Sequence, residues 1–495
     1  MGYLSKRRFR FSATGTTVAG LLLLAGVFVT IGLLRTQQAA AETAVVEAVC
    51  RHLLDNTTAG RQALVCSAWW PPLPTLLRLP LVSVFGILAC PMSSLVISAL
   101  FGAGVLILLD RILAGWRLGW LRYLFLAALV LQPQFLIACT NGSSDTTVLY
   151  FALLTLYGLT DWVATRQLRY LVYLGLGSSL LVLADASMVA WVLIVFLLLI
   201  VDQFRARESP SQKEAAIILG VVPAFYTIGL WVLMNWLIMG DWLYFVRPLF
   251  QLRIDPTPQT VMGLTRFHCA VTAAMLLPLL AGALWRRRAG VYNAVAVASL
   301  AVLALLLRAH ELLWPSSSIL IVLFPAALLG IGLVTRLVRG LSPAAAVVPG
   351  MLPLALTVLM LSGHLPPAQP EHSTLADVQR ERNLWRHRIR AHVLDRSQYG
   401  MVFCCGFDSF RLLGHESGDL FVHALDFNFN KAKDDYYGHR LFVLVPRPVG
   451  RSRLDSVHWK YPAIYTLGHR NALYDGDWGH WRLFEVIQAP RRTLR

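Results

Sequence analysis

Residues 17–34 read TVAGLLLLAGVFVTIGLL, an apolar run preceded by Lys6, Arg7, Arg8 and Arg10. A run of this length with no charged residue is long enough to cross the hydrocarbon core of a bilayer as a helix. It is too long for the apolar part of a typical signal peptide and lacks a clear small-residue cleavage site, so we expect an uncleaved membrane anchor. The basic residues ahead of it predict a cytoplasmic amino terminus.

Similar apolar runs recur along the first three quarters of the chain. Hydrophobic residues make up 56% of its 495 residues and charged residues 14%, proportions that an ordinary soluble domain does not have. Hydropathy predicts about eleven spans. They lie near residues 17–34, 91–109, 118–136, 146–162, 170–184, 187–203, 214–238, 268–285, 291–307, 317–335 and 343–361. Residues 72–89 are interrupted by prolines and are expected to form a helix lying along the membrane surface.

The net charge of +17 has a topological explanation. Much of the excess falls in turns between predicted spans, such as those holding Arg166 with Arg169 and Arg286 to Arg288. Basic cytoplasmic turns are the usual signature of membrane topology, so we expect a lipid bilayer and no nucleic acid as partner. An odd number of spans then places the carboxy terminus on the external face.

The composition changes to that of a soluble protein after His364. Short apolar segments such as residues 441–445 alternate there with Gly, Asp and Pro turns, which is typical of strands. We therefore predict an α-helical polytopic membrane domain over residues 1–363, with an external loop at 35–90. A small external soluble α/β domain is predicted over residues 364–495.

Two cysteines, Cys50 and Cys66, share the first external loop. An oxidising compartment would permit a disulfide between them, and the sequence leaves that pairing open. No Cys-x-x-Cys pair or His/Cys spacing indicates zinc.

The first external loop carries two acidic residues, Glu42 and Glu47, just after the first span. Carboxylates at the edge of a membrane tend to be functional, and one can accept the proton of an attacking hydroxyl. Glu47 follows Glu42 by about one and a half helical turns and therefore lies on a different face. The alternative is that both acids only stabilise the start of a loop helix, where negative charge favours the helix dipole.

The order of elements in this loop resembles that of the GT-C glycosyltransferases, in particular bacterial proteins similar to the dolichyl-phosphate-mannose-protein mannosyltransferases of family 39. In that class an Asp-Glu pair opens the loop, and a His-Pro-Pro-Leu-like element begins an interfacial helix. Here Glu42 stands where the leading acid falls, and Trp70 replaces His before Pro71-Pro72-Leu73. The resemblance implies a polytopic fold, a polyprenyl-phosphate sugar donor, and Glu42 as the catalytic base.

The second external loop contains Asn141-Gly142-Ser143-Ser144-Asp145. GT-C proteins often have a Ser-Asp pair here, and the resemblance implies that Asp145 assists catalysis or binds a divalent metal such as Mg²⁺ or Mn²⁺. An ordinary helix N-cap at Ser144 or Asp145 is the structural alternative.

A third external region provides candidate phosphate ligands. The segment from Asn235 through Gly240-Asp241 to Phe245 resembles an Asn…Gly-Asp-Pro-Leu-x-Phe sequence of bacterial GT-C-like proteins. Guanidinium groups bind phosphate bidentately, so we predict that the donor phosphate is contacted by arginines in this and the later external loop. The candidates are Arg247, Arg253 and Arg308, with Asp241, His310 and Glu311 as further site candidates. Headgroup contacts or pairing with nearby acids would account for these residues equally well.

One element departs from the class. Many relatives carry a Lys or Arg between the fifth and sixth spans, whereas residues 183–187 here read Leu-Ala-Asp-Ala-Ser. A protein that lacks this cation must hold a donor phosphate elsewhere, or it has lost the activity.

The sequence thus predicts a bacterial inner-membrane glycosyltransferase that moves a hexosyl or pentosyl group. The donor would be a polyprenyl-phosphate sugar, and the acceptor a lipid, glycan or protein on the external face. The first alternative is a non-catalytic GT-C-like subunit of a polysaccharide assembly or export complex. A transporter or lipid flippase ranks last, because no internal symmetry between halves is visible.

Overall fold

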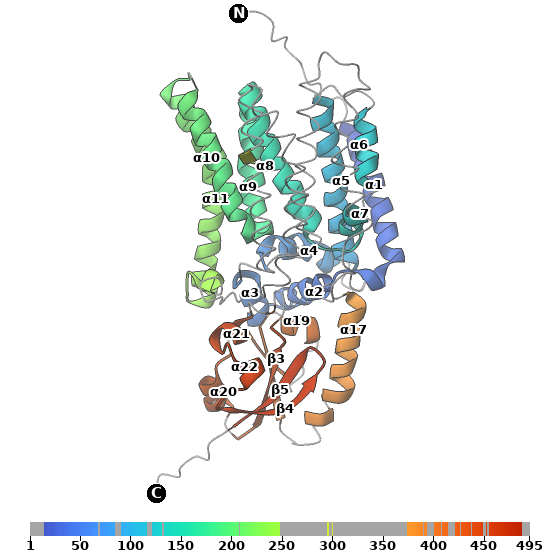
Figure 1. Ribbon diagram of the computed structural model, residues 1–495, viewed down its shortest axis with the longest axis vertical. Helices are drawn as coiled ribbons and strands as arrows, with labels where there is room; N and C mark the ends of the chain where they lie inside the picture. Colours follow the sequence, from blue (N-terminus) through green and yellow to red (C-terminus); the bar gives the residue numbers. More distant parts are fainter. Residues whose placement is uncertain are drawn as a thin grey trace, which may run out of the picture.

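The computed structural model describes residues 14–67, 70–84, 91–115, 121–130, 133–206, 208–247, 295–296, 299, 374–389, 391–393, 400–406, 408–413, 421–425, 427–436, 438–448, 452 and 455–487. These residues form a bundle of long helices with a small mixed sheet at one end (Figure 1). The spans predicted between residues 268 and 361 lie outside these ranges, apart from residues 295, 296 and 299.

The bundle follows the predicted spans closely. Its helices are α1 (Thr14–Leu34), α5 (Met92–Gly115), α6 (Leu121–Val130), α7 (Pro133–Thr140), α8 (Asp145–Thr165), α9 (Leu168–Ala184), α10 (Val189–Arg205, preceded by the 3-10 turn η2, Ala186–Met188) and α11 (Pro210–Met239). In the described part of the chain, the helices at α5, α8, η2–α10 and α11 are long and apolar enough to cross a membrane. The span predicted near 118–136 overlaps α6 and α7, and residues 131–132 between them lie outside the described ranges. The second helix begins at Pro133, whose missing N–H is tolerated in a first turn.

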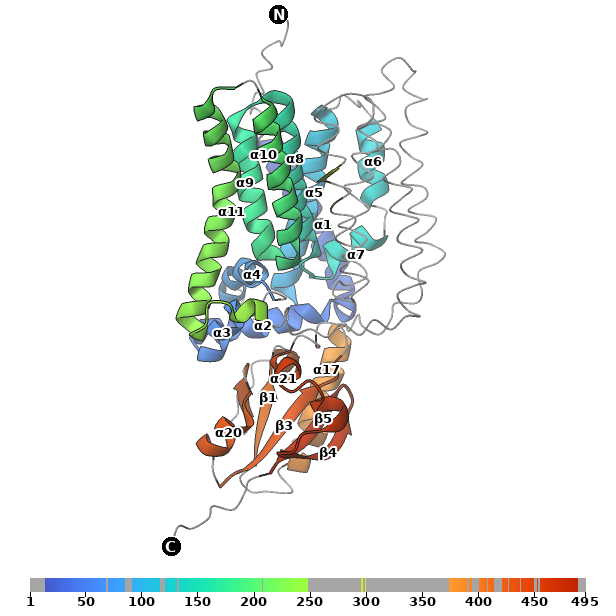
Figure 2. The same ribbon diagram turned by 60° about the vertical axis from the view of Figure 1, so that its left-hand side comes forward.

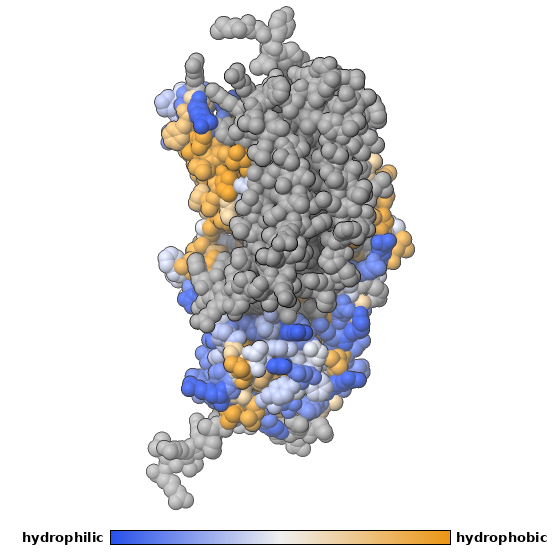
Figure 3. All heavy atoms as spheres, in the orientation of Figure 1, coloured by the Kyte–Doolittle hydropathy of each residue, from blue (hydrophilic) through white to orange (hydrophobic). Residues whose placement is uncertain are grey.

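The outer side of α10 and α11 is strongly apolar. Figure 3 shows hydrophobic residues along this side and hydrophilic residues over the sheet. Phe225, Tyr226 and Leu237 of α11 are exposed by 53%, 66% and 65%. Large apolar side chains exposed in this way fit contact with lipid better than contact with water.

Three short helices lie at the end of the bundle that faces the sheet (Figure 2). They are α2 (Ala41–Leu54), α3 (Thr58–Val65) and α4 (Pro72–Val84), with the 3-10 turn η1 (Thr36–Gln38) leading into α2. The position of α4 agrees with the helix expected along the membrane surface.

The carboxy-terminal part contains five strands: β1 (Gly400–Cys405), β2 (Phe421–Ala424), β3 (Arg440–Pro446), β4 (Ala472–Trp478) and β5 (Trp481–Val486). They form one sheet in the order β2-β1-β3-β5-β4. Strand β1 is parallel to β2 and β3, and β5 is antiparallel to β3 and β4. The central strand alternates its side chains between two cores, with Val443 facing one and Phe442 the other. The helices of this part are α17 (Leu375–Leu384), η4 (Trp385–Ile389), α19 (Asp408–Leu413), α20 (Phe429–Asp435), α21 (Ser456–Lys460) and α22 (Ile464–Leu467). The mixed sheet confirms the expected α/β character, while the boundary at residue 364 stays a prediction.

The sheet and the bundle share a hydrophobic junction. Val45 of α2 packs in one buried cluster with Phe410 of α19 and Leu425, which follows β2. Tyr244, in the 3-10 turn η3 (Tyr244–Val246) after α11, meets Trp459 of α21 edge to face, with ring centroids 6.3 Å apart. The carboxy-terminal part therefore rests directly on α2 and on the turn after α11.

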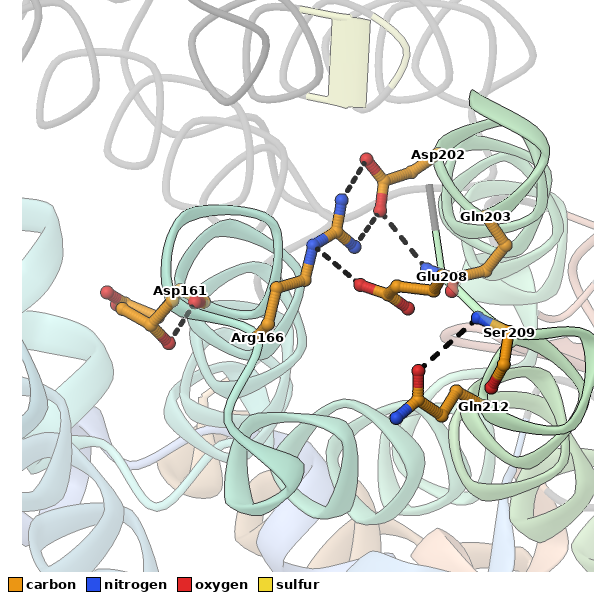
Figure 4. Close-up of polar contacts among 8 residues, drawn as sticks. Asp161, Arg166, Asp202, Gln203, Glu208, Ser209 and Gln212 are labelled. Atoms are coloured by element: carbon orange, nitrogen blue, oxygen red, sulfur yellow. Dashed lines mark hydrogen bonds and ion pairs between the residues drawn. The ribbon is translucent and has the colours of Figure 1, made fainter. Parts of the chain in front are cut away.

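The opposite end of the bundle is fastened by a polar cluster (Figure 4). Arg166, at the end of α8, pairs with both carboxylate oxygens of Asp202 in α10, one of them at 3.0 Å. Its Nε also lies 3.4 Å from Glu208, just before α11. Because Asp202 is only 1% exposed, this bidentate pair ties the α8–α9 turn to the α10–α11 turn inside the protein.

Candidate active site

Glu42 lies in the first turn of α2, where the bundle meets the sheet. Its side chain is 10% exposed. Ala40, the N-cap residue, makes no side-chain hydrogen bond to the helix, so an acid in the first turn also offsets the helix dipole. The position thus suits both the predicted base and the structural alternative.

Arg78 of α4 is the residue that faces Glu42, and the sequence reasoning did not single it out. It is 1% exposed, and its Nη1 lies 3.8 Å from Oε1 of Glu42. Its Nη2 donates a 2.7 Å hydrogen bond to the carbonyl oxygen of Gly142. Nε and Nη1 of Arg78 find no hydrogen-bond partner in the described residues. A lone arginine in the apolar sequence of residues 72–84 was the signal that could have found it.

The loop before α8, residues 141–144, is joined to this pair through Gly142. The side chain of Asn141 accepts a 2.9 Å bond from the amide of Ser143, whose hydroxyl lies 3.0 Å from Oδ2 of Asp145. Ser144 is the N-cap residue of α8 but makes no side-chain capping bond. The structure therefore connects Glu42 with the loop of Asp145 by way of Arg78, while the catalytic roles of both acids stay predictions.

The other candidates of the first loop have structural partners. Glu47 is buried and pairs with Arg51 one turn later at 2.7 Å. Trp70 packs against the buried cluster at the junction that contains Val45 and Phe410. Neither contact brings these two residues to Arg78.

The predicted phosphate ligands are divided between described and undescribed residues. Arg247 is 52% exposed and pairs with Asp241 at 2.7 Å. Gly240, directly before Asp241, has a left-handed backbone with φ 71°, so Gly240-Asp241 forms the turn that ends α11. The remaining candidates, Arg253, Arg308, His310 and Glu311, lie outside the described residues.

Two further positions of the sequence motifs serve the fold. Asn235 of α11 is fully buried and donates to the carbonyl oxygen of Val65 at 2.8 Å, which fixes the end of α3. Asp185, from the acidic element at residues 183–187, accepts the amide of Ser187 at 2.9 Å and caps η2.

The described residues do not assemble a metal site. A divalent cation such as Mg²⁺ takes several oxygen ligands. No group of three His, Cys, Asp or Glu side chains gathers anywhere in the described ranges. Asp145 contacts the Ser143 hydroxyl, and Glu42 faces a guanidinium. Binding of a divalent metal by Asp145 stays a prediction.

The two loop cysteines are not joined to each other. Cys50 and Cys66 are both buried free thiols, and Sγ of Cys50 lies 3.5 Å from the carbonyl oxygen of Thr75. Burial raises the pKa of the Cys50 thiol to about 12, so this group stays protonated and unreactive near neutral pH. The disulfide left open by the sequence is absent from the structure.

The architecture defines a class: a bundle of apolar helices with acidic and basic residues gathered where it meets a small mixed sheet. No family model matches the chain, and no curated protein sequence is similar to it. Among solved structures it is similar to ArnT from Cupriavidus metallidurans bound to undecaprenyl phosphate. That match has 13% identity, a TM-score of 0.38, and covers 97% of this chain and 100% of ArnT.

A second similar structure is the archaeal oligosaccharyltransferase AglB from Archaeoglobus fulgidus, in complex with an inhibitory peptide and a dolichol-phosphate. The identity is 12% and the TM-score 0.39, over 96% of this chain and 75% of AglB. ArnT and AglB are both GT-C enzymes, the class whose motifs the sequence resembles. At such identities and TM-scores the similarity assigns no activity to this chain.

Proposed function

We propose that this chain is an integral membrane glycosyltransferase that moves a sugar from a polyprenyl-phosphate donor to an acceptor on the face carrying the sheet. The observation that carries the proposal is the buried guanidinium of Arg78 opposite Glu42. Unmade hydrogen bonds of a buried charged group are costly, so Nε and Nη1 of Arg78 favour an anionic partner that arrives with the substrate. The phosphate of a lipid carrier has that chemistry.

The residues at this place suit a single displacement. The hydroxyl oxygen of the acceptor attacks the anomeric carbon of the sugar, and Glu42 takes the hydroxyl proton. The bond between the anomeric carbon and the phosphate oxygen breaks, and its electron pair leaves with the carrier phosphate. Arg78 would stabilise the charge that grows on this phosphate. Arg247, Arg253 and Arg308 remain candidates for further phosphate contacts, and Asp145 for binding the acceptor hydroxyl.

We place the sheet on the external face of a bacterial inner membrane, with the amino terminus in the cytoplasm. Support comes from the turns that end α8 and α10, which carry Arg166 and Arg205 at the end of the bundle away from the sheet (Figure 1). Alkaline phosphatase fused after residue 487 should be active, and a fusion after Arg205 inactive. The opposite pattern would reverse the orientation.

The test is sugar transfer from a panel of radiolabelled polyprenyl-phosphate sugars to membrane extract, using protein in lipid nanodiscs. We expect Glu42→Gln to lower the rate by about 100-fold or more, because a general base contributes about 10²–10⁴-fold. Glu47→Gln is the matched control, since Glu47 lies on the same helix but pairs with Arg51. Its rate should stay within a few-fold of the wild type.

The second candidate is a non-catalytic subunit that keeps the fold. Asp185 favours it, because an acidic helix cap stands where relatives carry a cation. Donor binding without transfer by the wild type, whichever sugar is offered, would establish this candidate and refute the enzyme. Equal rates for Glu42→Gln and Glu47→Gln would remove Glu42 from the chemistry.

A further inference from the structure

The backbone just before Glu42 is held from two sides. The amide of Ala40 donates to the carbonyl oxygen of Asn141 at 2.8 Å, which ties it to the second external loop. On the other side, the amide of Leu375 donates to the carbonyl oxygen of Ala39, also at 2.8 Å. Ala40 and Thr374 form an isolated antiparallel bridge around this bond. A segment far along the chain thus pairs with the residues that lead into α2.

The Leu375 amide lies at the start of helix α17 (Leu375–Leu384), where it can donate outside the helix. Its N-cap residue, Thr374, forms a capping box with Asp377: the Asp377 amide donates to the Thr374 hydroxyl, and Oδ2 of Asp377 accepts the Thr374 amide at 2.7 Å. The amides of a first helical turn have no partner inside the helix. The amide of Leu375 is one of these, and Ala39 supplies the acceptor.

Side chains reinforce the same contact. Leu375 and Val378 of α17 are 4% and 0% exposed, and they pack on Ala39, Ala41 and Ala44. Because Ala41 and Ala44 flank Glu42 on α2, this small cluster fixes the turn that carries the carboxylate. The alanines allow the two helices to approach closely.

We propose that α17 is a positioning element for Glu42 and that the Leu375 amide acts as its clamp on the backbone of Ala39. The carboxylate then keeps its place opposite Arg78 only while the carboxy-terminal part is docked. The catalytic side of this inference rests on the proposed function. A displacement of about 1 Å at a reacting group can cost 100-fold in rate, so one backbone bond is enough to matter.

Leu375→Pro removes the amide and, with it, most of the buried apolar side chain. Leu375 is the first residue of α17, a position that accepts proline, and Thr374 has ψ 167°, which suits a residue before proline. Leu375→Ala is the matched control, because it removes the side chain and keeps the amide. The difference between the two variants reports the hydrogen bond.

Two readouts are compared in nanodiscs: hydrogen exchange of a peptide covering residues 39–46, and kcat with KM for the donor. Leu375→Pro should exchange at least tenfold faster in that peptide than Leu375→Ala and lose about tenfold or more in kcat with little change in KM. Equal exchange and equal kcat in the two variants would overturn the clamp. If the wild type transfers no sugar, the proposed function fails, and the exchange comparison still decides whether the clamp exists.

A second variant covers the case in which Leu375→Pro does not fold. Ala40→Cys with Thr374→Cys joins the bridged residues by a disulfide that locks the docked arrangement. We expect the oxidised protein to keep the kcat of its reduced form. A loss of about tenfold or more on oxidation, restored by reductant, would show that catalysis needs this contact to open and would overturn the proposal.

Discussion

Arg78 donates a 2.7 Å hydrogen bond to the carbonyl oxygen of Gly142, 64 residues further along the chain. The bond joins α4 to the loop before α8 and leaves the rest of the guanidinium turned toward Glu42. The segment that contains α2 and α4 and the loop before α8 therefore form one structural unit around a buried positive charge.

Replacing Arg78 by Met should be strongly destabilising. The change leaves the carboxylate of Glu42 without its cation and the Gly142 oxygen without its donor, and breaking a buried pair costs about 3–5 kcal/mol. Urea unfolding followed by tryptophan fluorescence measures the loss. Arg51→Met is the control, since Arg51 is 34% exposed and its pair with Glu47 is expected to contribute no more than about 1 kcal/mol. Similar losses in both variants would contradict the burial argument.

Gly142→Ala should destabilise the protein for two reasons, the positive φ of residue 142 and a steric contact of the added methyl group. Gly142 has φ 76°, and a Cβ there would lie 2.7 Å from Cγ2 of Thr43. Gly240 also has positive φ, at 71°, but no atom lies within 4 Å of its added Cβ. We expect Gly240→Ala to lower the free energy of unfolding by about 1–2 kcal/mol because of backbone strain. Gly142→Ala should lower it by about 1–3 kcal/mol more because of overpacking. Thermal melting compares the two, and equal shifts would refute the steric contact.

At the end of the bundle away from the sheet, Asp202→Asn should lower the stability of the protein far more than Glu208→Gln. Asp202 is 1% exposed and holds Arg166 bidentately, so the substitution should destabilise by about 3–5 kcal/mol. Glu208 is 25% exposed and meets only Nε of the same arginine, which predicts at most about 1 kcal/mol. Melting temperatures in nanodiscs test this order, and a reversal would be inconsistent with the structure.

The buried His423, at the junction between the sheet and the bundle, should make the stability of the protein fall in acid. Burial, together with the nearby His52, lowers the pKa of His423 to about 3 from its ordinary 6.5. The unfolded chain therefore binds more protons between these values, and stability is complete above pH 6.5 and falls as the pH drops below it. The slope is at most about 1.4 kcal/mol per pH unit from this group.

The pH prediction is tested by melting curves at pH 7.5 and 5.0. The wild type should lose stability at pH 5.0, and His423→Leu should lose less, because it removes the group that the unfolded chain protonates. The control His387→Gln changes an exposed histidine and should keep the wild-type response. The same pH response in His423→Leu would exclude His423 as its source.

Much of the fold follows from local sequence patterns. Apolar runs place α1, α5 and α8 to α11 within a few residues, because span length is set by bilayer thickness and read directly from hydropathy. The prolines before Leu73 and the strand pattern of residues 441–445 likewise predict α4 and β3.

The candidate site was predictable only in part. Glu42 and Asp145 were found because acids at the edge of apolar runs are rare enough to stand out. Arg78 was missed because its sequence neighbours are leucines, and its meaning depends on partners in two other loops. Arg247 pairs with Asp241 across the turn that ends α11, a contact that the sequence does not reveal, and its role as a phosphate ligand stays a prediction.

The sequence by itself determined that this protein is a helical membrane chain with basic turns on one side and a mixed α/β part beyond the bundle, because hydrophobicity and charge act locally along the chain. Only the tertiary structure decided that Glu42 faces Arg78, that Arg78 holds Gly142, and that Leu375 clamps Ala39. Such contacts join residues far apart in sequence. They form because buried polar groups must find partners wherever packing brings their helices together.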